Sequence, residues 1–357
     1  MINSGYEIDF IPVDSGKKNG DAISIRITEN NITKIYVIDG GTKTSGQTLV
    51  DHIKTYYGTN RVDYLINTHP DLDHISGLTI VMEQLDVREL WMHKPWEHSH
   101  EIINDIIDNR VTVNSLTKRL QNSLKIAKQI EQMAIEKGIP VNEPFQGQNI
   151  GHFHVLSPDP DWYNELIMGF NNMPASEKTT VIGEAVKQFT DTIRTVVENW
   201  NIETLSEDGL TSDKNESSVV LFGRLPNSFD VLLTADAGLI SLNKAYNYAL
   251  SKNLDLRICK FIQMPHHGSR RNVSPSLLNK ILGPKLPVNS QPVKTAYVNT
   301  SKDCPEHPKK SVSNAFFRRG VEVISTNGKT ICRRWGYPSR NGWGALTPLP
   351  FFNQVEE

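Results

Sequence analysis

The sequence predicts an α/β fold, and two observations support that prediction. Short apolar runs of strand length alternate with segments of helical period along most of the chain. Several of these runs end directly on polar side chains of the metal-binding type, which is where sites gather in α/β folds. The length of 357 residues suggests about two domains, but a single α/β domain with insertions also reaches this size.

The first part of the chain contains strands followed by αβ alternation. Alternating apolar residues predict strands over 8–13, 22–27 and 35–38, with a turn rich in Gly, Lys and Asn between the first two. We then expect a helix over 47–57, a buried strand over 62–67, a helix over about 77–84 and a strand over 152–156.

Two inserts of helical character interrupt this pattern. Residues 101–137 carry apolar side chains at steps of three or four. The second insert spans about 160–212, and its apolar stripe at helical spacing runs from Ala185 to Trp200. Most such stripes face a buried core, and a lid or an oligomer contact is the alternative.

The second half returns to αβ alternation. Strands are predicted over 218–222, 230–234, 261–264, 295–298 and 321–324. Helices are predicted over 239–252 and near 308–318, and residues 341–357 are interpreted as a C-terminal tail.

The segment 68–74, Thr-His-Pro-Asp-Leu-Asp-His, is the most informative stretch of the sequence. It places His69, Asp71, Asp73 and His74 on the loop that follows a predicted strand. Imidazole and carboxylate groups at this density suit a divalent cation. The alternative is a polar turn in which Asp73 caps the next helix, but such a turn does not require two histidines.

Three more polar clusters lie at strand ends in the second half. Asp236 follows one predicted strand, His266 and His267 follow the next, and His307 lies on the segment after a third. Each cluster is a weak signal alone, because an Asp after a strand is most often a cap or a turn. Together with segment 68–74 they favour one site at the ends of several strands. By contrast, the histidines at 93, 98 and 100 lack that placement and a set of carboxylate partners, and we interpret them as structural or solvent-exposed.

Eight short motifs occur in order through most of the chain. They are Asn19-Gly-Asp-Ala22, Ile38-Asp-Gly-Gly41, Thr68 to His74, Asn215-Glu-Ser-Ser218, Leu232-Leu-Thr-Ala-Asp236, His266-His-Gly-Ser269, His307-Pro308 and Thr326-Asn-Gly328. The set resembles the metallo-β-lactamase fold superfamily, and within it the branch typified by the hydrolase domain of ComEC-type DNA-uptake competence proteins. The helical inserts fall largely outside the resemblance. This chain carries no membrane channel, so the DNA-uptake role does not transfer.

The resemblance implies a four-layer αβ/βα sandwich with a metal site at one edge between two sheets. It implies a single domain over 1–340, with the two helical inserts within it. Two divalent metal ions are expected. His69 and Asp71 would hold the first ion. The second would be held by Asp73, His74 and one of His266 and His267, and Asp236 would bridge both.

Two positions depart from the commoner pattern of the superfamily. Asp71 stands where a third histidine is usual, and Asn215 stands where another metal-binding histidine is expected. Oxygen-rich sites suit Mn²⁺ or Mg²⁺ better than zinc, which prefers imidazole and thiolate. We therefore expect manganese, with zinc or magnesium as the alternatives.

A two-metal centre activates a water molecule and stabilises charge on phosphate oxygens, which favours a phosphodiester substrate. Asp73 and Asp236 would orient the water. His307 would hold the phosphate or protonate the leaving oxygen, and a purely structural role before Pro308 is its alternative. The expected substrate contacts are Asn215, Ser217 or Ser218, Ser269, Arg270, Arg271, Lys309 and Lys310.

The charge distribution also favours a polyanionic substrate. The net charge of the chain is −2, yet residues 257–340 contain sixteen Lys and Arg against three acidic residues. A solvated basic face explains such a surplus equally well. The leading hypothesis is a metal-dependent nuclease or other phosphodiesterase acting on DNA or RNA. The alternatives are hydrolysis of a cyclic nucleotide, lactone or β-lactam, and a partner-binding module or homo-oligomer that uses the helical inserts.

The compartment is predicted from what the sequence lacks. No apolar stretch approaches the roughly 20 residues that a membrane span needs, and the N-terminus has no signal-peptide pattern. The three cysteines are an odd number without Cys-x-x-Cys spacing. We expect a cytoplasmic protein without a disulfide framework.

Overall fold

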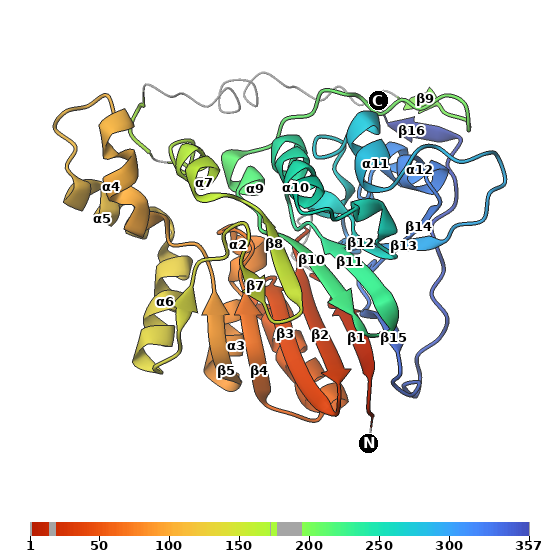
Figure 1. Ribbon diagram of the computed structural model, residues 1–357, viewed down its shortest axis with the longest axis horizontal. Helices are drawn as coiled ribbons and strands as arrows, with labels where there is room; N and C mark the ends of the chain where they lie inside the picture. Colours follow the sequence, from red (N-terminus) through yellow and green to blue (C-terminus); the bar gives the residue numbers. More distant parts are fainter. Residues whose placement is uncertain (1, 14–18, 172, 177–194, 357) are drawn as a thin grey trace.

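Two large β-sheets lie face to face in the molecule (Figure 1). The computed structural model describes residues 2–13, 19–171, 173–176 and 195–356, and within these ranges each sheet has seven strands. The predicted α/β class is confirmed. The turn predicted between the first two strands falls largely on residues 14–18, which lie outside the described residues.

The first sheet has the strand order β15-β1-β2-β3-β4-β5-β6. Its strands are β1 (Gly5–Phe10), β2 (Ala22–Glu29), β3 (Ile32–Gly40), β4 (Arg61–Ile66), β5 (Asp86–Trp91), β6 (Val141–Asn142) and β15 (Ile331–Trp335). Strands β15 to β3 pair antiparallel, whereas β3 to β6 pair in parallel. The carboxyl ends of β3 and β4 therefore lie at one edge of this sheet.

The second sheet repeats this plan, with the order β14-β13-β12-β11-β10-β8-β7. Its strands are β7 (Asn149–Ile150), β8 (Phe153–Ser157), β10 (Val220–Leu225), β11 (Phe229–Leu233), β12 (Phe261–Gln263), β13 (Lys294–Val298) and β14 (Val321–Ser325). Strands β7 to β11 pair antiparallel and β11 to β14 pair in parallel. The carboxyl ends of β11, β12 and β13 thus share an edge too.

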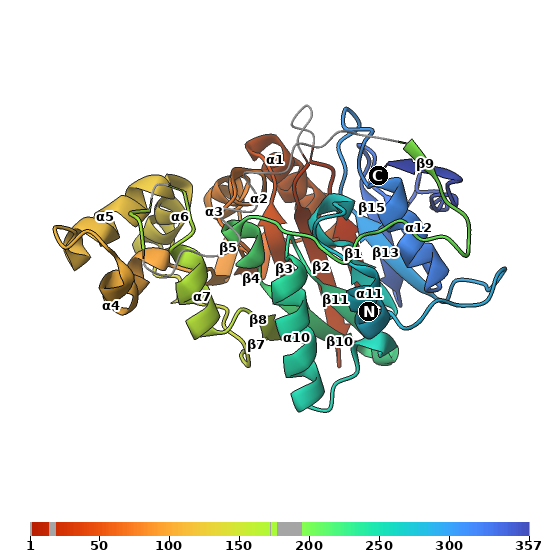
Figure 2. The ribbon, with the colours of Figure 1, turned by 90° about the horizontal axis from the view of Figure 1, so that it is seen from above.

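Helices cover the outer face of each sheet, so the molecule has four layers (Figure 2). On the first sheet lie α1 (Lys43–His52), its π-helical continuation η1 (Ile53–Tyr57) and α3 (Leu78–Gln84). On the second lie α10 (Leu239–Ser251), α11 (Pro275–Ile281) and α12 (Lys310–Arg318), with the short turns η5 (Pro226–Ser228) and η6 (Leu256–Ile258) between strands. A third apolar core between the sheets includes Ile8, Ile25, Leu221, Val231 and Phe261. Burial of these side chains holds the layers together.

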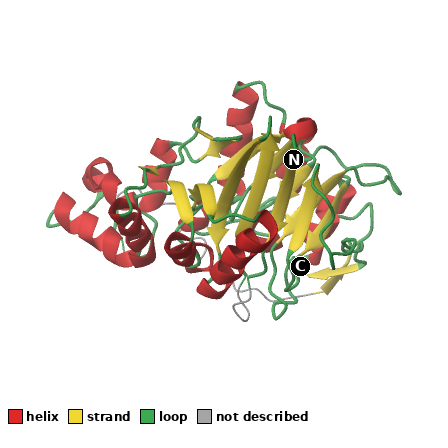
Figure 3. Ribbon diagram, turned by 90° about the horizontal axis from the view of Figure 1, so that it is seen from below, coloured by secondary structure: helices red, strands yellow, loops and turns green. Residues whose placement is uncertain are grey.

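A helical lobe projects at one end of the sandwich (Figure 3). It contains η2 (Pro95–His98), α4 (Ser99–Ile102), η3 (Ile103–Asp105), α5 (Val113–Ser123), α6 (Lys125–Glu136) and α7 (Pro160–Ile167). The helical period predicted over 101–137 is confirmed, since Leu116, Leu120, Ile130 and Ala134 are buried.

The stripe predicted at helical spacing in the second insert lies mostly in residues 177–194, outside the described residues. The prediction was wrong for Val196 and Val197, which lie in the short strand β9 (Thr195–Val197). β9 pairs with β16 (Gln354–Glu356), so the segment expected to be a tail ends in a strand. Backbone pairing with a distant strand decides the conformation here, and local periodicity does not report it.

Three strands of the first sheet, β5, β6 and β15, were missed in the sequence, and β6 has only two residues. β5 contains three charged residues, and β15 contains two adjacent arginines and is largely exposed. β15 lies at the edge of the sheet beside β1, where charged side chains are common. The polar composition of β5 and β15 hides the strand pattern.

Among the described residues, no helix combines the length and apolar composition needed to cross a bilayer.

Part of the positive surplus in residues 257–340 is neutralised inside the fold. Arg318 and Arg319 are buried, with nitrogens 3.1 Å and 2.7 Å from carboxylate oxygens of Glu198 and Glu203. Arg340 pairs with Asp9 at 2.7 Å. These arginines therefore support the structure and are not part of a basic face.

Replacement of Glu198 by alanine should lower the free energy of unfolding by about 3–5 kcal/mol, because it leaves the Arg318 charge buried without its partner. The Arg318 and Glu198 side chains are both 0% exposed. Denaturant-induced unfolding measures the change. The control is Asp86→Ala, which breaks the exposed pair with Arg88 and should cost less than about 1 kcal/mol. Equal losses for the two variants would contradict the prediction.

Candidate metal centre

The polar strand-end segments of both sheets meet at one edge of the sandwich. The loop after β4 carries His69 and leads into the short helix α2 (Leu72–Ile75), which contains His74. Asp236 follows β11. The turn η7 (Pro265–Gly268) follows β12 and carries His266 and His267.

Asp236 is the common neighbour of four imidazoles. Its Oδ2 atom lies 3.4 Å from His74 Nε2, 3.5 Å from His266 Nε2 and 3.9 Å from His69 Nε2. Its Oδ1 atom lies 3.5 Å from His267 Nε2. Both members of the adjacent histidine pair thus face the same carboxylate.

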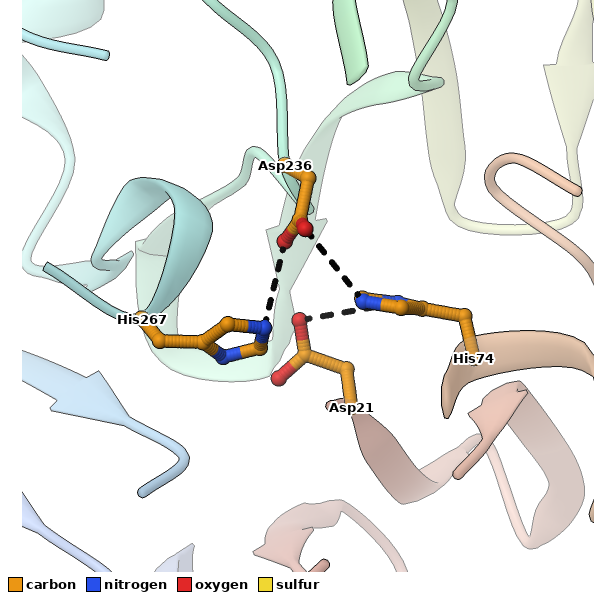
Figure 4. A group of neighbouring side chains, drawn as sticks. All are labelled: Asp21, His74, Asp236 and His267. Atoms are coloured by element: carbon orange, nitrogen blue, oxygen red, sulfur yellow. Dashed lines mark ion pairs between the residues drawn. The ribbon is translucent and has the colours of Figure 1, made fainter. Parts of the chain in front are cut away.

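Four buried residues form the tightest group of ligand atoms (Figure 4). Asp21, His74, Asp236 and His267 place one ligand atom each within 4.8 Å of one another. This set, called the core ligand group below, draws Asp21 and His74 from the first sheet and the other two from the second. A second group within the same distance consists of Asp39, His69 and His74.

The protein fixes the orientation of the imidazoles through their other ring nitrogen. His74 Nδ1 donates to Asp39 Oδ2 at 2.9 Å. His267 Nδ1 donates to the carbonyl oxygen of Asn299 at 3.1 Å. In the neutral form of both rings Nε2 then carries the lone pair and faces Asp236, as in metal-binding histidines.

Four buried atoms around Asp236 have no hydrogen-bond partner among the described residues. They are Nε2 of His69, His74 and His267, and Oδ1 of Asp236. Buried polar groups are nearly always hydrogen-bonded, so four such atoms in one place need an explanation. Imidazole nitrogens and carboxylate oxygens are the usual ligands of divalent ions of this kind. The residues present fit a divalent metal ion, and the core ligand group would hold it.

Burial changes the proton affinities of the core ligand group. Burial raises the pKa of Asp21 to about 7, and the nearby Asp236 carboxylate adds to the shift while His74 opposes it. Burial also lowers the pKa of His267 to about 4, against the attraction of Asp236. The surrounding imidazoles hold the pKa of Asp236 well below its usual value although burial opposes this. A cation among these groups would offset the cost of burying the carboxylate charges.

Asp39 organises the outer side of the site. Its carboxylate accepts from the Thr68 backbone N–H at 2.8 Å, from the Thr68 hydroxyl at 2.5 Å and from Asn67 Nδ2 at 3.2 Å, besides His74. The Thr68 hydroxyl also lies 3.1 Å from His69 Nδ1. One buried carboxylate thus fixes the strand-end loop and two of its histidines.

Gln263 ties the two sheets together behind the core ligand group. Its Nε2 donates to Asp21 Oδ2 at 2.8 Å, and its Oε1 accepts from the Ala235 backbone N–H at 3.0 Å. Next to Asp21, Gly20 lets the loop 68–74 approach, since a Cβ there would lie 2.0 Å from the Asp73 carbonyl oxygen. A larger residue at position 20 would push this loop away.

Four of the predicted ligands lie outside the core ligand group. His69 belongs to the second group, and His266 faces Asp236 without belonging to either group among the described residues. The other two are Asp71 and Asp73. Asp71 Oδ2 is 3.9 Å from His69 Nε2, and its Oδ1 pairs with Lys214 Nζ at 3.0 Å. Asp73 belongs to neither group of ligand atoms among the described residues. Its metal and catalytic roles stay predictions.

The structure places Asn215 and Ser217 on the short helix α9 (Asp213–Glu216) and at its C-terminal end. The Asn215 amide Nδ2 lies 3.4 Å from both ring nitrogens of His266 and donates to Thr211 at 2.8 Å. The buried Ser217 hydroxyl donates to the Lys214 carbonyl at 2.6 Å. Ser217 therefore stabilises α9, and this contact differs from the substrate contact predicted for it.

His307 lies next to the histidine pair. A Cβ at Gly268 would lie 2.4 Å from Pro308 Cβ, so the two loops are in close contact there. Burial lowers the pKa of His307 to about 4, with Lys309 and His267 adding to the shift. His307 is therefore a neutral imidazole at neutral pH.

Arg270 and Arg271 line a cavity of about 300 Å³, together with Asp208, Ser311 and Glu356. The Ser269 hydroxyl accepts from the Arg271 backbone N–H at 3.3 Å. Lys310 is exposed, and its ammonium lies over the Phe352 ring. Of the predicted substrate residues, Arg270 and Arg271 line this cavity, and the substrate roles of the whole set stay predictions.

The sequence reasoning missed Asp21, Asp39, Lys214 and Gln263. Asp21 and Asp39 belong to motifs that carry the family resemblance, but no ligand or supporting role was derived for them. The signal available was an Asp at the start of one strand and another at the end of the next, each beside glycine. Lys214 and Gln263 showed no comparable signal.

Residues 24–156 match the family model described as the metallo-beta-lactamase superfamily. The match covers less than half of the chain, and over this stretch the chain is similar to the metallo-beta-lactamase superfamily. The superfamily consists of metal-dependent hydrolases. The matched residues include His69 and His74, whereas Asp236 and His267 lie outside the matched range, on loops of the second sheet. No curated protein sequence matches the chain significantly.

Several solved structures are similar to this chain at low identity. A diphosphatase of the PhnP family has 12% identity over 92% of this chain and 98% of its own, with a TM-score of 0.38. A metallo-beta-lactamase from Cronobacter sakazakii has 10% identity over 69% and 75%, with a TM-score of 0.30. AidC, a dizinc quorum-quenching lactonase, has 12% identity over 60% and 56%, with a TM-score of 0.28. Identities and TM-scores this low do not indicate which substrate the chain acts on.

Replacement of Asp39 by alanine should weaken metal binding about 10–100-fold, because His74 loses the carboxylate that orients its ring. Calorimetric titration with Mn²⁺ measures the affinity. Asp63→Ala is the matched control, since Asp63 is also buried and accepts a backbone hydrogen bond, from Ile35 at 3.0 Å. Unchanged affinity in a folded Asp39→Ala protein would contradict the prediction.

His93 belongs to neither group of ligand atoms among the described residues and stacks on Tyr163, with ring centroids 4.2 Å apart. Burial lowers the pKa of His93 from 6.5 to about 3. Between these values the unfolded chain binds the proton more strongly, so stability should fall as the pH drops from 6.5 towards 3, by up to about 1.4 kcal/mol per pH unit. His93→Phe should keep the stacking and remove this part of the slope. Unfolding experiments at several pH values would refute this if both proteins gave equal slopes.

Proposed function

We propose that this chain is a phosphodiesterase of the ComEC-type branch of the metallo-beta-lactamase superfamily and that it hydrolyses DNA or RNA. The observation that carries the proposal is the junction of two basic loops beside the core ligand group. Residues 266–271 and 302–310 together contain five Lys and Arg against two acidic residues. The Lys309 backbone N–H donates to the Gly268 carbonyl oxygen at 3.1 Å, which joins the loops. Positive charge beside a metal centre suits a phosphate backbone.

The divalent ion and the side chains of the chain would contribute different parts of the hydrolysis. When bound, a divalent ion lowers the pKa of a water molecule and stabilises charge that develops on phosphate oxygens. Asp236 Oδ1, buried and unpartnered among the described residues, can accept a hydrogen bond from that water and orient it. Asp73 is proposed to share this role.

His307 is proposed to hold the phosphate. Because the pKa of His307 is about 4, the ring is neutral at pH 7 and has no imidazolium proton to give to the leaving oxygen. A neutral ring still donates one hydrogen bond. Of the two roles expected from the sequence, this favours binding of a phosphate oxygen over protonation of the leaving group.

Manganese is the proposed ion. The core ligand group offers two carboxylates besides two imidazoles. Carboxylate oxygens suit Mn²⁺, whereas zinc sites favour imidazole and thiolate. Activity lost to a chelator should therefore return with Mn²⁺, and recovery with zinc alone would contradict this choice.

A small phosphodiester such as a cyclic nucleotide is the second candidate. The cavity beside Arg270 and Arg271 has a volume of about 300 Å³, at the lower end of small-ligand sites. Salt separates the two candidates. Cleavage of a polymer that contacts several phosphates weakens steeply as salt rises, whereas a small substrate with one phosphate responds weakly.

With Mn²⁺, the protein should cleave labelled single- or double-stranded DNA or RNA, and His74→Ala should reduce the rate by more than about 100-fold, because it removes a proposed ligand. Gel electrophoresis of the labelled products measures cleavage. His154→Ala is the control, since this histidine of β8 lies outside both groups of ligand atoms and bonds Asn149. Cleavage that persists in His74→Ala would indicate a contaminant, and no cleavage of any nucleic acid would refute the proposed substrate.

A further inference from the structure

The position implied for a first metal ion differs from the core ligand group in its donor atoms. The resemblance places that ion at His69 and Asp71. In the structure, His69 Nε2 lies 3.9 Å from Asp71 Oδ2 and 3.9 Å from Asp236 Oδ2. Asn215 stands where another histidine is expected, and its amide Nδ2 faces His266 and donates to Thr211. The donors that remain at this position are the His69 imidazole, the Asp71 carboxylate and the Asp236 carboxylate, which also belongs to the core ligand group.

Lys214 supplies positive charge at this position. Its ammonium nitrogen lies 3.0 Å from Asp71 Oδ1, and the two side chains are only 19% and 32% exposed. An ammonium group and a divalent cation are alternatives for the same carboxylate, because each compensates its charge and the two repel each other. The ion pair therefore disfavours a metal ion bound to Asp71.

The backbone around Lys214 is held firmly, so the ammonium is part of a built site. Ser212 caps α9 by accepting from the Asn215 backbone N–H at 3.2 Å. Ser217 donates to the Lys214 carbonyl oxygen. Glu216 accepts from the Ser241 backbone N–H at 2.8 Å and so attaches α9 to the start of α10. The short helix has capping contacts at both ends.

The core ligand group differs from the position at Asp71 in its burial and in the charges beside it. Its four residues are all buried, and within the described part of the chain no lysine or arginine is ion-paired with Asp21 or Asp236. Three of its atoms are the unpartnered Nε2 of His74 and His267 and Oδ1 of Asp236. These three donor atoms lie together without a lysine or arginine paired to them among the described residues.

We propose that the chain binds a single divalent ion, at Asp21, His74, Asp236 and His267, and that the Lys214 ammonium takes the place of the second ion at Asp71. Lys214 is then a fixed positive charge beside the ion. An ammonium has three N–H donors, of which Asp71 accepts one, so Lys214 can also bind a phosphate oxygen of the substrate. The inference concerns the same centre as the proposed function, but the number of bound ions can be measured without any substrate.

The test counts ions in the intact protein. The wild-type chain is saturated with Mn²⁺, freed of unbound metal and analysed by mass spectrometry of the metal and by electron paramagnetic resonance. We expect one ion per chain and the spectrum of an isolated Mn²⁺. Two ions per chain with the spectrum of an exchange-coupled pair would overturn the proposal. Failure of the nuclease assay would leave this count unaffected, so the two proposals fail separately.

Three variants locate the ion and test Lys214. Asp71→Asn should still bind one ion, whereas it would lose one of two if Asp71 were a ligand. Lys214→Ala should take up a second, weaker ion as the Mn²⁺ concentration rises, because Asp71 is released. Lys214→Arg is the matched control and should keep one ion. Circular dichroism and thermal melting check the fold of each variant. A folded Lys214→Ala protein that never binds a second ion would overturn the assignment of Lys214.

Discussion

The buried carboxylate of Asp236, faced by four imidazoles, is the interaction on which the rest of the site depends. A buried charge is costly unless charges or ligands compensate it, and these imidazoles come from loops of both sheets. The arrangement therefore exists only while the sheets keep their relative position. Phe10 of the first sheet contacts Phe261 and Tyr297 of the second edge to face, with centroids 5.9 Å and 5.4 Å apart. The apolar core between the sheets holds them in the relative position that the polar centre at their edge requires.

Asp21 shows how the second sheet prepares a ligand that belongs to the first. Its carboxylate accepts from Gln263 Nε2 at 2.8 Å and from Asn299 Nδ2 at 3.0 Å. The Asn299 carbonyl in turn accepts from His267. The two hydrogen bonds to Asp21 join residues more than two hundred positions apart in the chain, and they hold its carboxylate in place before any ion binds. Orientation by such outer contacts is what keeps a metal site rigid.

The sequence could predict those parts of the fold and site that depend on local pattern. Apolar runs predicted the strands β4, β11 and β12. The polar residues that follow these strands meet in the structure, as expected where the carboxyl ends of parallel strands share an edge. The strand β15 could not be found, because its pairing with β1 is long-range and its side chains are polar. For the same reason the charge count overstated the basic face. Arg318 finds its partner Glu198 at a distance of 120 positions, and no count along the chain reveals that pairing.

Long-range pairing also decides what the departures at Asp71 and Asn215 mean. From the sequence alone, the two departures weaken the expected metal site and suggest an oxygen-rich site that binds its ion less tightly. In the fold, Lys214 is adjacent in sequence to Asn215 and lies against Asp71, so the two departures and the lysine form one local unit. A carboxylate paired with a fixed ammonium needs no ion, whereas the unpartnered donors around Asp236 still do. The charge that a second ion would bring is already part of the chain, and unlike an ion it does not dissociate.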